Sequence, residues 1–219
     1  MAMAMQLVFF LYMLVPITVC DDVFKLVNSS VQLDIPEHLD KSSSIFFWTL
    51  KKKDINIVVY LRNTETTIYE GYEEMVEFNN KTYSLTLKNL QKSDSVIYEA
   101  KVAGSRNIIV ATYQLHVLDP VQKPVLTASL QRNDTCNVTL TCEAQKLSVT
   151  SHCYNDTCDM REKKTSGDMF PFLSLYVSKS FIICNHSNPV SWKNYTMEIK
   201  HVKQLCPSEG VSMHTYCLV

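Results

Sequence analysis

Residues 83–102 read YSLTLKNLQKSDSVIYEAKV, and this stretch decides the fold of the first half of the chain. Successive side chains of a β-strand point to opposite faces, so alternating apolar residues predict a strand with one buried side. The apolar positions are Tyr83, Leu85 and Leu87 before a polar turn, and Tyr98, Ala100 and Val102 after it. Glu99 and Lys101 fall on the opposite side. The pattern predicts two strands, each with one buried side.

The same period of two continues on both sides of that stretch. The inward positions are Val31, Leu33 and Ile35, then Phe46, Trp48 and Leu50, and finally Tyr113, Leu115 and Val117. Turn-rich segments separate these runs, and the first half shows no long helical period. The prediction is an all-β fold in which two antiparallel sheets pack as a sandwich.

Composition excludes several classes of function. The chain has 219 residues, 46% of them apolar and 20% charged, which is enough to bury a core in one large domain or two small ones. Its four glycines are too few for the loops that cradle phosphates in nucleotide-binding enzymes. The 21 basic and 22 acidic residues give a net charge of -1, so we expect no nucleic acid partner.

The two ends of the chain predict secretion. Residues 1–20 carry no charged side chain, and Leu7–Val15 form an apolar run of signal-peptide length that ends at Pro16. We expect cleavage before Asp21, with an uncleaved anchor or a buried helix as the alternative. The other end shows neither a spanning segment nor a lipid-anchor signal, which predicts a soluble extracellular protein without a membrane anchor.

Acceptor sites for N-linked glycans agree with export. The seven N-x-S/T sites lie at Asn28, Asn80, Asn133, Asn137, Asn155, Asn185 and Asn194. We therefore expect a glycoprotein, and we expect carbohydrate-bearing patches to be poor places for a protein contact.

Residues 83–102 also carry a family resemblance. Asp94 precedes Tyr98 by four residues, as at the E-to-F corner of immunoglobulin variable-type domains, and Trp48 occupies the place of the strand-C tryptophan. The two positions that usually carry the intersheet disulfide are the apolar Leu33 and Ala100. A first domain of this kind resembles the SLAM and CD2 family of immunoglobulin-superfamily leukocyte receptors, most of all its CD48-type members. The segments LHVLDPVQKPV, DTCNVTLTC and CNHSNPVSWKN strengthen the resemblance.

The resemblance implies two tandem immunoglobulin-like domains. Pro120 and Pro124 interrupt any continuous strand, and seven of the eight cysteines follow them. We predict a signal peptide at 1–20, a variable-type domain at 21–119, a stiff linker at 120–124, a constant-like domain at 125–208 and a tail at 209–219.

The resemblance also implies how the cysteines pair. Cys142 is expected to pair with Cys184 across the second sandwich, and Cys136 with Cys206. Cys153 replaces the family's core tryptophan there, and Ile182 replaces its tyrosine. We interpret Cys153 and Cys158 as a compensating local bridge. Cys217 is then left over, which predicts a disulfide-linked dimer unless one pairing is misassigned.

The family binds partners through one sheet of the first domain, the GFCC′ face. The residues that the resemblance places on this partner-binding face are Phe47, Thr49, Lys51, Lys53, Tyr60, Arg62, Glu99, Lys101, Arg106, Asn107, Thr112 and Gln114. Phe47 and Tyr60 are the candidate aromatic anchors, although a one-residue register error would turn either ring inward. For the charge run of Lys51, Lys52, Lys53 and Asp54 the alternative is a solvated hairpin tip.

The expected function is binding of a SLAM-family receptor ectodomain, with the natural killer cell receptor 2B4 favoured. Without an anchor, such a ligand would be a soluble decoy, as in a virus-encoded homologue that blocks adhesion and signalling. Two alternatives stay open: homophilic or other SLAM-family binding, and a disulfide-linked secreted scaffold with no immune receptor.

Catalysis and cofactors are not expected. No GxSxG elbow, HExxH helix or paired-carboxylate motif occurs in the sequence. His152, Cys153, Cys158 and His186 could suggest a metal site. An oxidising compartment favours disulfides between such cysteines instead.

Overall fold

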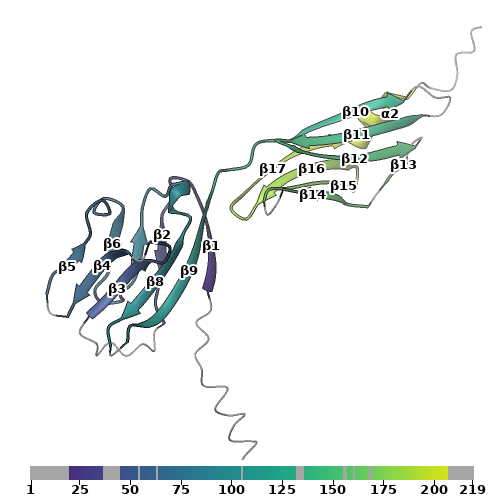
Figure 1. Cartoon of the computed structure of the whole chain (residues 1–219). Coiled ribbons are helices and arrows are strands. Elements are labelled where there is room, and N and C mark those ends of the chain that lie inside the picture. The colour runs from purple at the N-terminus through teal and green to yellow at the C-terminus, as the bar shows by residue number, and fades with distance from the viewer. Residues whose placement is uncertain are drawn as a thin grey trace, which may run out of the picture. The chain divides into compact units, whose positions relative to one another are not determined.

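The computed structural model describes residues 20–36, 45–53, 55–62, 64–104, 106–131, 136–154, 157–159, 161–167 and 170–206. The chain divides into two compact units, Met1–Asp119 and Pro120–Val219 (Figure 1). Within the described ranges, every helix is too short or too polar to cross a bilayer. The predicted signal peptide up to residue 19, the sequons at Asn133 and Asn155, and Cys217 lie outside the described residues.

The first unit is a sandwich of a larger and a smaller sheet, as predicted. The larger sheet has the strand order β1 (Cys20–Leu26), β9 (Ile108–Leu118), β8 (Ile97–Val102), β3 (Ile45–Leu50), β4 (Ile55–Leu61) and β5 (Thr66–Ile68). The smaller sheet has the order β2 (Val31–Leu33), β7 (Leu85–Leu87) and β6 (Val76–Phe78), and a 3-10 turn spans Lys92–Asp94. The pairs are antiparallel except β1 with β9, which run parallel.

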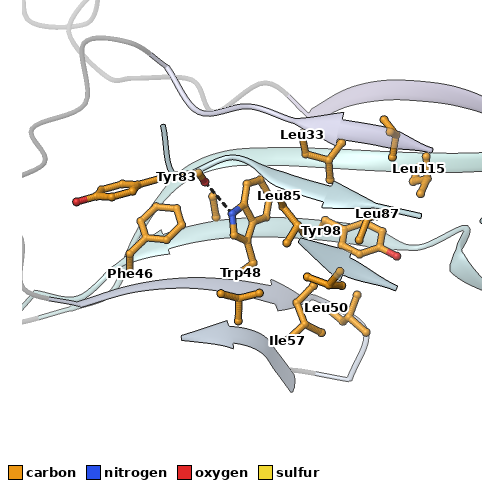
Figure 2. Packing of buried hydrophobic residues seen from close by; sticks show 14 of the residues in the cluster. Leu33, Phe46, Trp48, Leu50, Ile57, Tyr83, Leu85, Leu87, Tyr98 and Leu115 are labelled. Atoms are coloured by element: carbon orange, nitrogen blue, oxygen red, sulfur yellow. Dashed lines mark hydrogen bonds between the residues drawn. The ribbon is translucent and has the colours of Figure 1, made fainter. Parts of the chain in front are cut away.

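Alternating apolar residues form the core between these sheets (Figure 2). Trp48 is fully buried, and its indole Nε1 donates a hydrogen bond to the Tyr83 carbonyl oxygen at 3.0 Å. Leu33 and Ala100 are 1% and 0% exposed, so close packing joins the sheets where related domains carry a disulfide. The Tyr98 hydroxyl donates to the Asp94 carbonyl oxygen at 3.3 Å. Burial and the nearby Asp94 carboxylate raise the pKa of Tyr98, which keeps that donor protonated.

The second unit contains two four-stranded antiparallel sheets. The first consists of β10 (Val125–Gln131), β11 (Asn137–Ala144), β12 (Leu147–Tyr154) and β13 (Thr157–Cys158). The second consists of β14 (Lys163–Ser166), β15 (Phe172–Ser178), β16 (Phe181–Asn188) and β17 (Ser191–Glu198). The sequence interpretation did not include the short helix α2 (Ile199–Gln204), whose Val202 is buried in the core.

Three disulfides stabilise this unit, and they join the pairs that the resemblance implied. They are Cys142–Cys184, Cys136–Cys206 and Cys153–Cys158. Cys153 and Ile182, the two positions at which the resemblance implied a loss of aromatic residues, are both fully buried in the core of this unit.

The segment between Pro120 and Pro124 has no regular secondary structure, but it is bonded to the second unit. The Val121 amide donates to Ser191 Oγ at 2.9 Å, and the Val121 side chain is buried. His186 Nδ1 lies 2.8 Å from the Gln122 carbonyl oxygen, so this ring nitrogen donates a hydrogen bond. These bonds order a stretch in which proline excludes ladder hydrogen bonds.

Candidate functional site

The outward side of the larger sheet of the first unit is the candidate binding surface, here called the front face. Because Phe46 and Trp48 point into the core, Phe47 between them points outward. Phe47 pairs with Val59 of β4 on one side and with Lys101 of β8 on the other. Lys101 in turn pairs with Ile109 of β9. These four residues form one continuous row across four strands.

This row gives the front face an apolar centre. Phe47 and Val59 are half-buried, and Ile109 is 36% exposed. Leu61, which pairs with Ile45 in the next row, is 41% exposed. Neighbouring apolar side chains with partial exposure are typical of a surface that is covered by a partner protein.

A buried carboxylate organises the charges of the next row. Glu99 is only 3% exposed, although it lies on the outward side of β8. Its Oε1 lies 3.3 Å from Lys51 Nζ, and its Oε2 lies 3.0 Å from Lys101 Nζ. A buried charge is costly unless it is paired, so the two ammonium groups stabilise Glu99 and are positioned by it. The neighbouring Thr49 and Thr112 are also buried.

Basic residues occupy the turns around the front face. Lys52 and Lys53 are exposed in the β3–β4 turn, Arg62 is exposed just after β4, and Arg106 is exposed between β8 and β9. Lys51 adds a further ammonium group whose side chain is 56% exposed. The buried Glu99 neutralises part of this charge, and the exposed lysine and arginine side chains would favour acidic groups on a partner surface.

The prediction that Tyr60 anchors a partner from this face is wrong. Tyr60 pairs with the inward-facing Phe46, and its ring lies 5.6 Å from that of Phe78 and 5.5 Å from that of Tyr83. A bulge between Trp48 and Thr49 shifts the register of β4. The strand INIVVYL is apolar on both faces, so its sequence pattern does not show which side is buried. Val59 takes the outward position instead.

The remaining predicted residues fall on the front face or at its rim. Gln114 is half-buried on β9, and Asn107 is exposed in the β8–β9 turn. The sequence interpretation missed the apolar residues Val59, Leu61 and Ile109 of this face, the last two of which are 41% and 36% exposed. The apolar run after Asn107 was the available signal. A bulge between Ala100 and Lys101 decides which of these residues meets the centre of the face.

The two glycan acceptors of the first unit lie in turns outside the strands of the front face. Asn28 is exposed in the turn between β1 and β2, and Asn80 is exposed in the turn between β6 and β7. The strands that build the front face carry no sequon in the sequence. Carbohydrate attached to this unit would therefore leave its binding surface accessible.

The metal alternative conflicts with the observed bonding. Cys153 and Cys158 are bonded to each other, so neither offers a free thiolate. The ring of His186 is held by the Gln122 carbonyl oxygen. Among the residues that the structure describes, no cluster of three potential ligands could hold a metal ion.

Replacing Lys101 with methionine tests the charge arrangement around Glu99. Methionine keeps an unbranched apolar stem but removes the ammonium group, leaving Glu99 with Lys51 alone. We expect the free energy of unfolding of the first unit to fall by about 2 kcal/mol. The measurement is hydrogen exchange of the β8 amides in the full chain. The exposed Lys53→Met is the matched control, and equal effects of the two variants would contradict the role of the pair.

Comparison with protein-family models finds no match. Comparison with individual protein sequences does find relatives. SLAM family member 5 of Mus musculus is 31% identical over 103 residues, which cover 45% of this chain and 31% of that protein. The natural killer cell receptor 2B4 of Rattus norvegicus is 27% identical over 135 residues, covering 60% and 43%. Lymphocyte function-associated antigen 3 of Homo sapiens is 26% identical over 203 residues, covering 90% and 75%. The chain thus spans less than half the length of the first two relatives.

Solved structures show the same fold. The CD2-binding domain of CD58, which is lymphocyte function-associated antigen 3, superimposes with a TM-score of 0.56 at 20% identity, covering 83% of this chain and 97% of that one. Murine CEACAM1b gives a TM-score of 0.56 at 22% identity, covering 80% and 94%. At this identity the likeness establishes the immunoglobulin-like architecture of the chain.

Proposed function

This chain is a homologue of the SLAM and CD2 family of immunoglobulin-superfamily receptors, and from that premise we propose that its first unit binds another receptor of the family through the front face. Its relatives are immune receptors and adhesion molecules, which are not enzymes. The observation that carries the proposal is the row of Val59, Phe47, Lys101 and Ile109, an accessible apolar centre within a basic rim.

Two features of the surface support binding rather than a purely structural role. An apolar centre surrounded by charge is the usual anatomy of a protein interface, in which the centre supplies affinity and the charges select the partner. Phe47 lies at the middle of the row, where truncation of an aromatic side chain is most costly. One homologous structure is described as a CD2-binding domain, so a relative with this fold does bind a receptor.

The first partner to test is the natural killer cell receptor 2B4, itself among the homologues. An extracellular location agrees with the three disulfides of the second unit, because disulfides persist in oxidising compartments. Released from the cell, the chain would occupy the receptor without bridging two cells, and it would thereby block the adhesion and signalling that depend on that receptor. This soluble decoy is the specific activity that we propose.

The test is a binding screen of the purified full chain at physiological salt, where surface electrostatics are not exaggerated. The panel contains the SLAM-family ectodomains, 2B4 and the chain itself. We expect Phe47→Ser to weaken binding by about 30-fold, since a central aromatic anchor contributes about 2 kcal/mol or more. Phe181→Ser, at a 43% exposed phenylalanine of the second unit, is the matched control.

Three outcomes separate the possibilities. Binding to 2B4 that Phe47→Ser weakens and Phe181→Ser leaves unchanged supports the proposal. Binding only to a second copy of the chain would mean that the partner is the chain itself and not another receptor. Absence of binding to every ectodomain would leave the secreted scaffold as the better hypothesis.

A further inference from the structure

The second unit has an exposed aromatic face that the proposed function does not use. It is the outward side of the sheet β14–β17, here called the aromatic face. Leu173 and Leu175 of β15 and Cys184 of β16 are at most 1% exposed, so the residues that alternate with them point outward. One outward row runs from Phe172 through Ser187 to Trp192. The next row runs from Ser174 through Asn185 to Asn194.

Trp192 and Phe172 are unusually open to solvent for their size. Trp192 is 68% exposed and Phe172 is 43% exposed. Both lie in the same row, separated only by the small Ser187. Two large aromatic side chains exposed to this extent on one face indicate a surface that another group covers.

The adjacent row carries two glycan acceptors side by side. Asn185 begins the sequon Asn-His-Ser, and Asn194 begins the sequon Asn-Tyr-Thr. The two asparagines pair directly across β16 and β17, which places their Cβ atoms about 5 Å apart. Asn194 is exposed, whereas Asn185 is half-buried. Asn194 is therefore the more accessible acceptor of the pair.

Trp192 and Asn194 are two residues apart on one strand and point to the same side. At the rise of a β-strand, their Cα atoms are about 7 Å apart. A sugar attached to Asn194 therefore leaves the strand on the same side as the indole, one same-face position away. Pyranose rings present a face of C–H groups that packs well against an aromatic ring, whose faces carry partial negative charge. The geometry matches a glycan that folds back along β17.

We propose that the aromatic face is covered by an N-linked glycan on Asn194, whose first sugars lie against Trp192. The oligosaccharide comes from a polyprenyl-diphosphate donor. A bond forms between Asn194 Nδ2 and the anomeric carbon of the first sugar, and the bond from that carbon to the diphosphate oxygen breaks. The displaced amide proton balances the charge on the released diphosphate, and nothing is oxidised or reduced. The glycan shields apolar surface that would otherwise favour self-association.

The two tryptophans of the chain provide a direct measurement. Trp48 is fully buried, so a soluble quencher of tryptophan fluorescence reports mainly on Trp192. The full chain is expressed in glycosylating cells, and the variant Thr196→Val removes the sequon hydroxyl while keeping a β-branched residue in the strand. We expect the quenching constant to rise about twofold in this variant, because one of the two indole faces is uncovered. Thr196→Ser, which keeps the sequon, should behave like the natural chain.

Further measurements keep the result independent of folding defects in a variant. Peptide mass mapping should find Asn194 glycosylated, and enzymatic release of the glycan from the folded natural chain should reproduce the increase in quenching. Light scattering should then show concentration-dependent association, which the additional change Trp192→Ser suppresses. An unmodified Asn194, or quenching that does not change on release, would overturn the proposal. If the fully glycosylated chain associates and its Trp192 is protected from the quencher only in the associated form, the aromatic face is covered by a second copy of the chain instead.

Discussion

Trp48→Ala is expected to lower the free energy of unfolding of the first unit by about 3–5 kcal/mol, the usual cost of removing a large buried aromatic side chain. The indole is fully buried among Phe46, Tyr83 and Tyr113, and its Nε1 donates to the Tyr83 carbonyl oxygen. Alanine leaves a cavity and removes the hydrogen bond that the indole donates to the Tyr83 carbonyl oxygen. Domain stabilities are about 5–15 kcal/mol, so this loss removes a large fraction of the stability of a unit whose described part has no disulfide to limit the unfolded state.

Hydrogen exchange measures this loss unit by unit in the full chain. The amides of β7 and β8 should exchange about 150-fold to about 5,000-fold faster in Trp48→Ala, which is the same free energy expressed as a ratio. The matched control is Trp192→Ala at the exposed tryptophan of the second unit, where we expect a change below about 0.5 kcal/mol. Similar effects of the two substitutions would mean that Trp48 does not join the sheets as described.

Removing the Cys142–Cys184 disulfide is the second large effect. The bond closes a loop of sequence separation 42, and the chain-entropy relation for such a loop corresponds to about 4 kcal/mol. Both cysteines are fully buried in the core, so replacing them with alanine also removes packing. In the double variant, the second unit should therefore unfold at a markedly lower urea concentration than in the natural chain. Hydrogen exchange of the β16 amides at increasing urea concentration measures this.

The Cys153–Cys158 disulfide is the internal comparison. Its sequence separation is only 5, for which the same relation gives about 2 kcal/mol. The variant without this bond should be the more stable of the two. The opposite order would show that the short bridge contributes by packing in the place of the missing aromatic residues rather than by restricting the unfolded chain.

The sequence predicted most of the first sandwich because its strands are amphipathic. The alternation around Trp48, Leu85, Tyr98 and Leu115 assigned the buried face correctly, since the intervening residues are largely polar. The resemblance to the SLAM and CD2 family is confirmed by the homologues. The three cysteine pairs that it implied are present in the structure.

The strand β4 shows where pattern alone was insufficient. Its residues Ile57 and Val58 are both fully buried, so the period of two is lost at the bulge opposite Trp48. A second bulge, at Ala100 and Lys101, brings Ile109 into the central row. The helix α2 was also missed, because six residues with one buried side chain show no helical period.

By itself, the sequence determined the all-β class, the inward face of most strands of the first unit and its kinship, because all three depend on residue type and local spacing. Only the tertiary structure decided that Tyr60 turns inward, that Val59 and Ile109 flank Phe47, and that Asn185 meets Asn194. Each of these depends on the register between strands that are distant in sequence. Register is set by bulges and by the packing of the whole sheet, where one residue of shift exchanges the buried face for the exposed one.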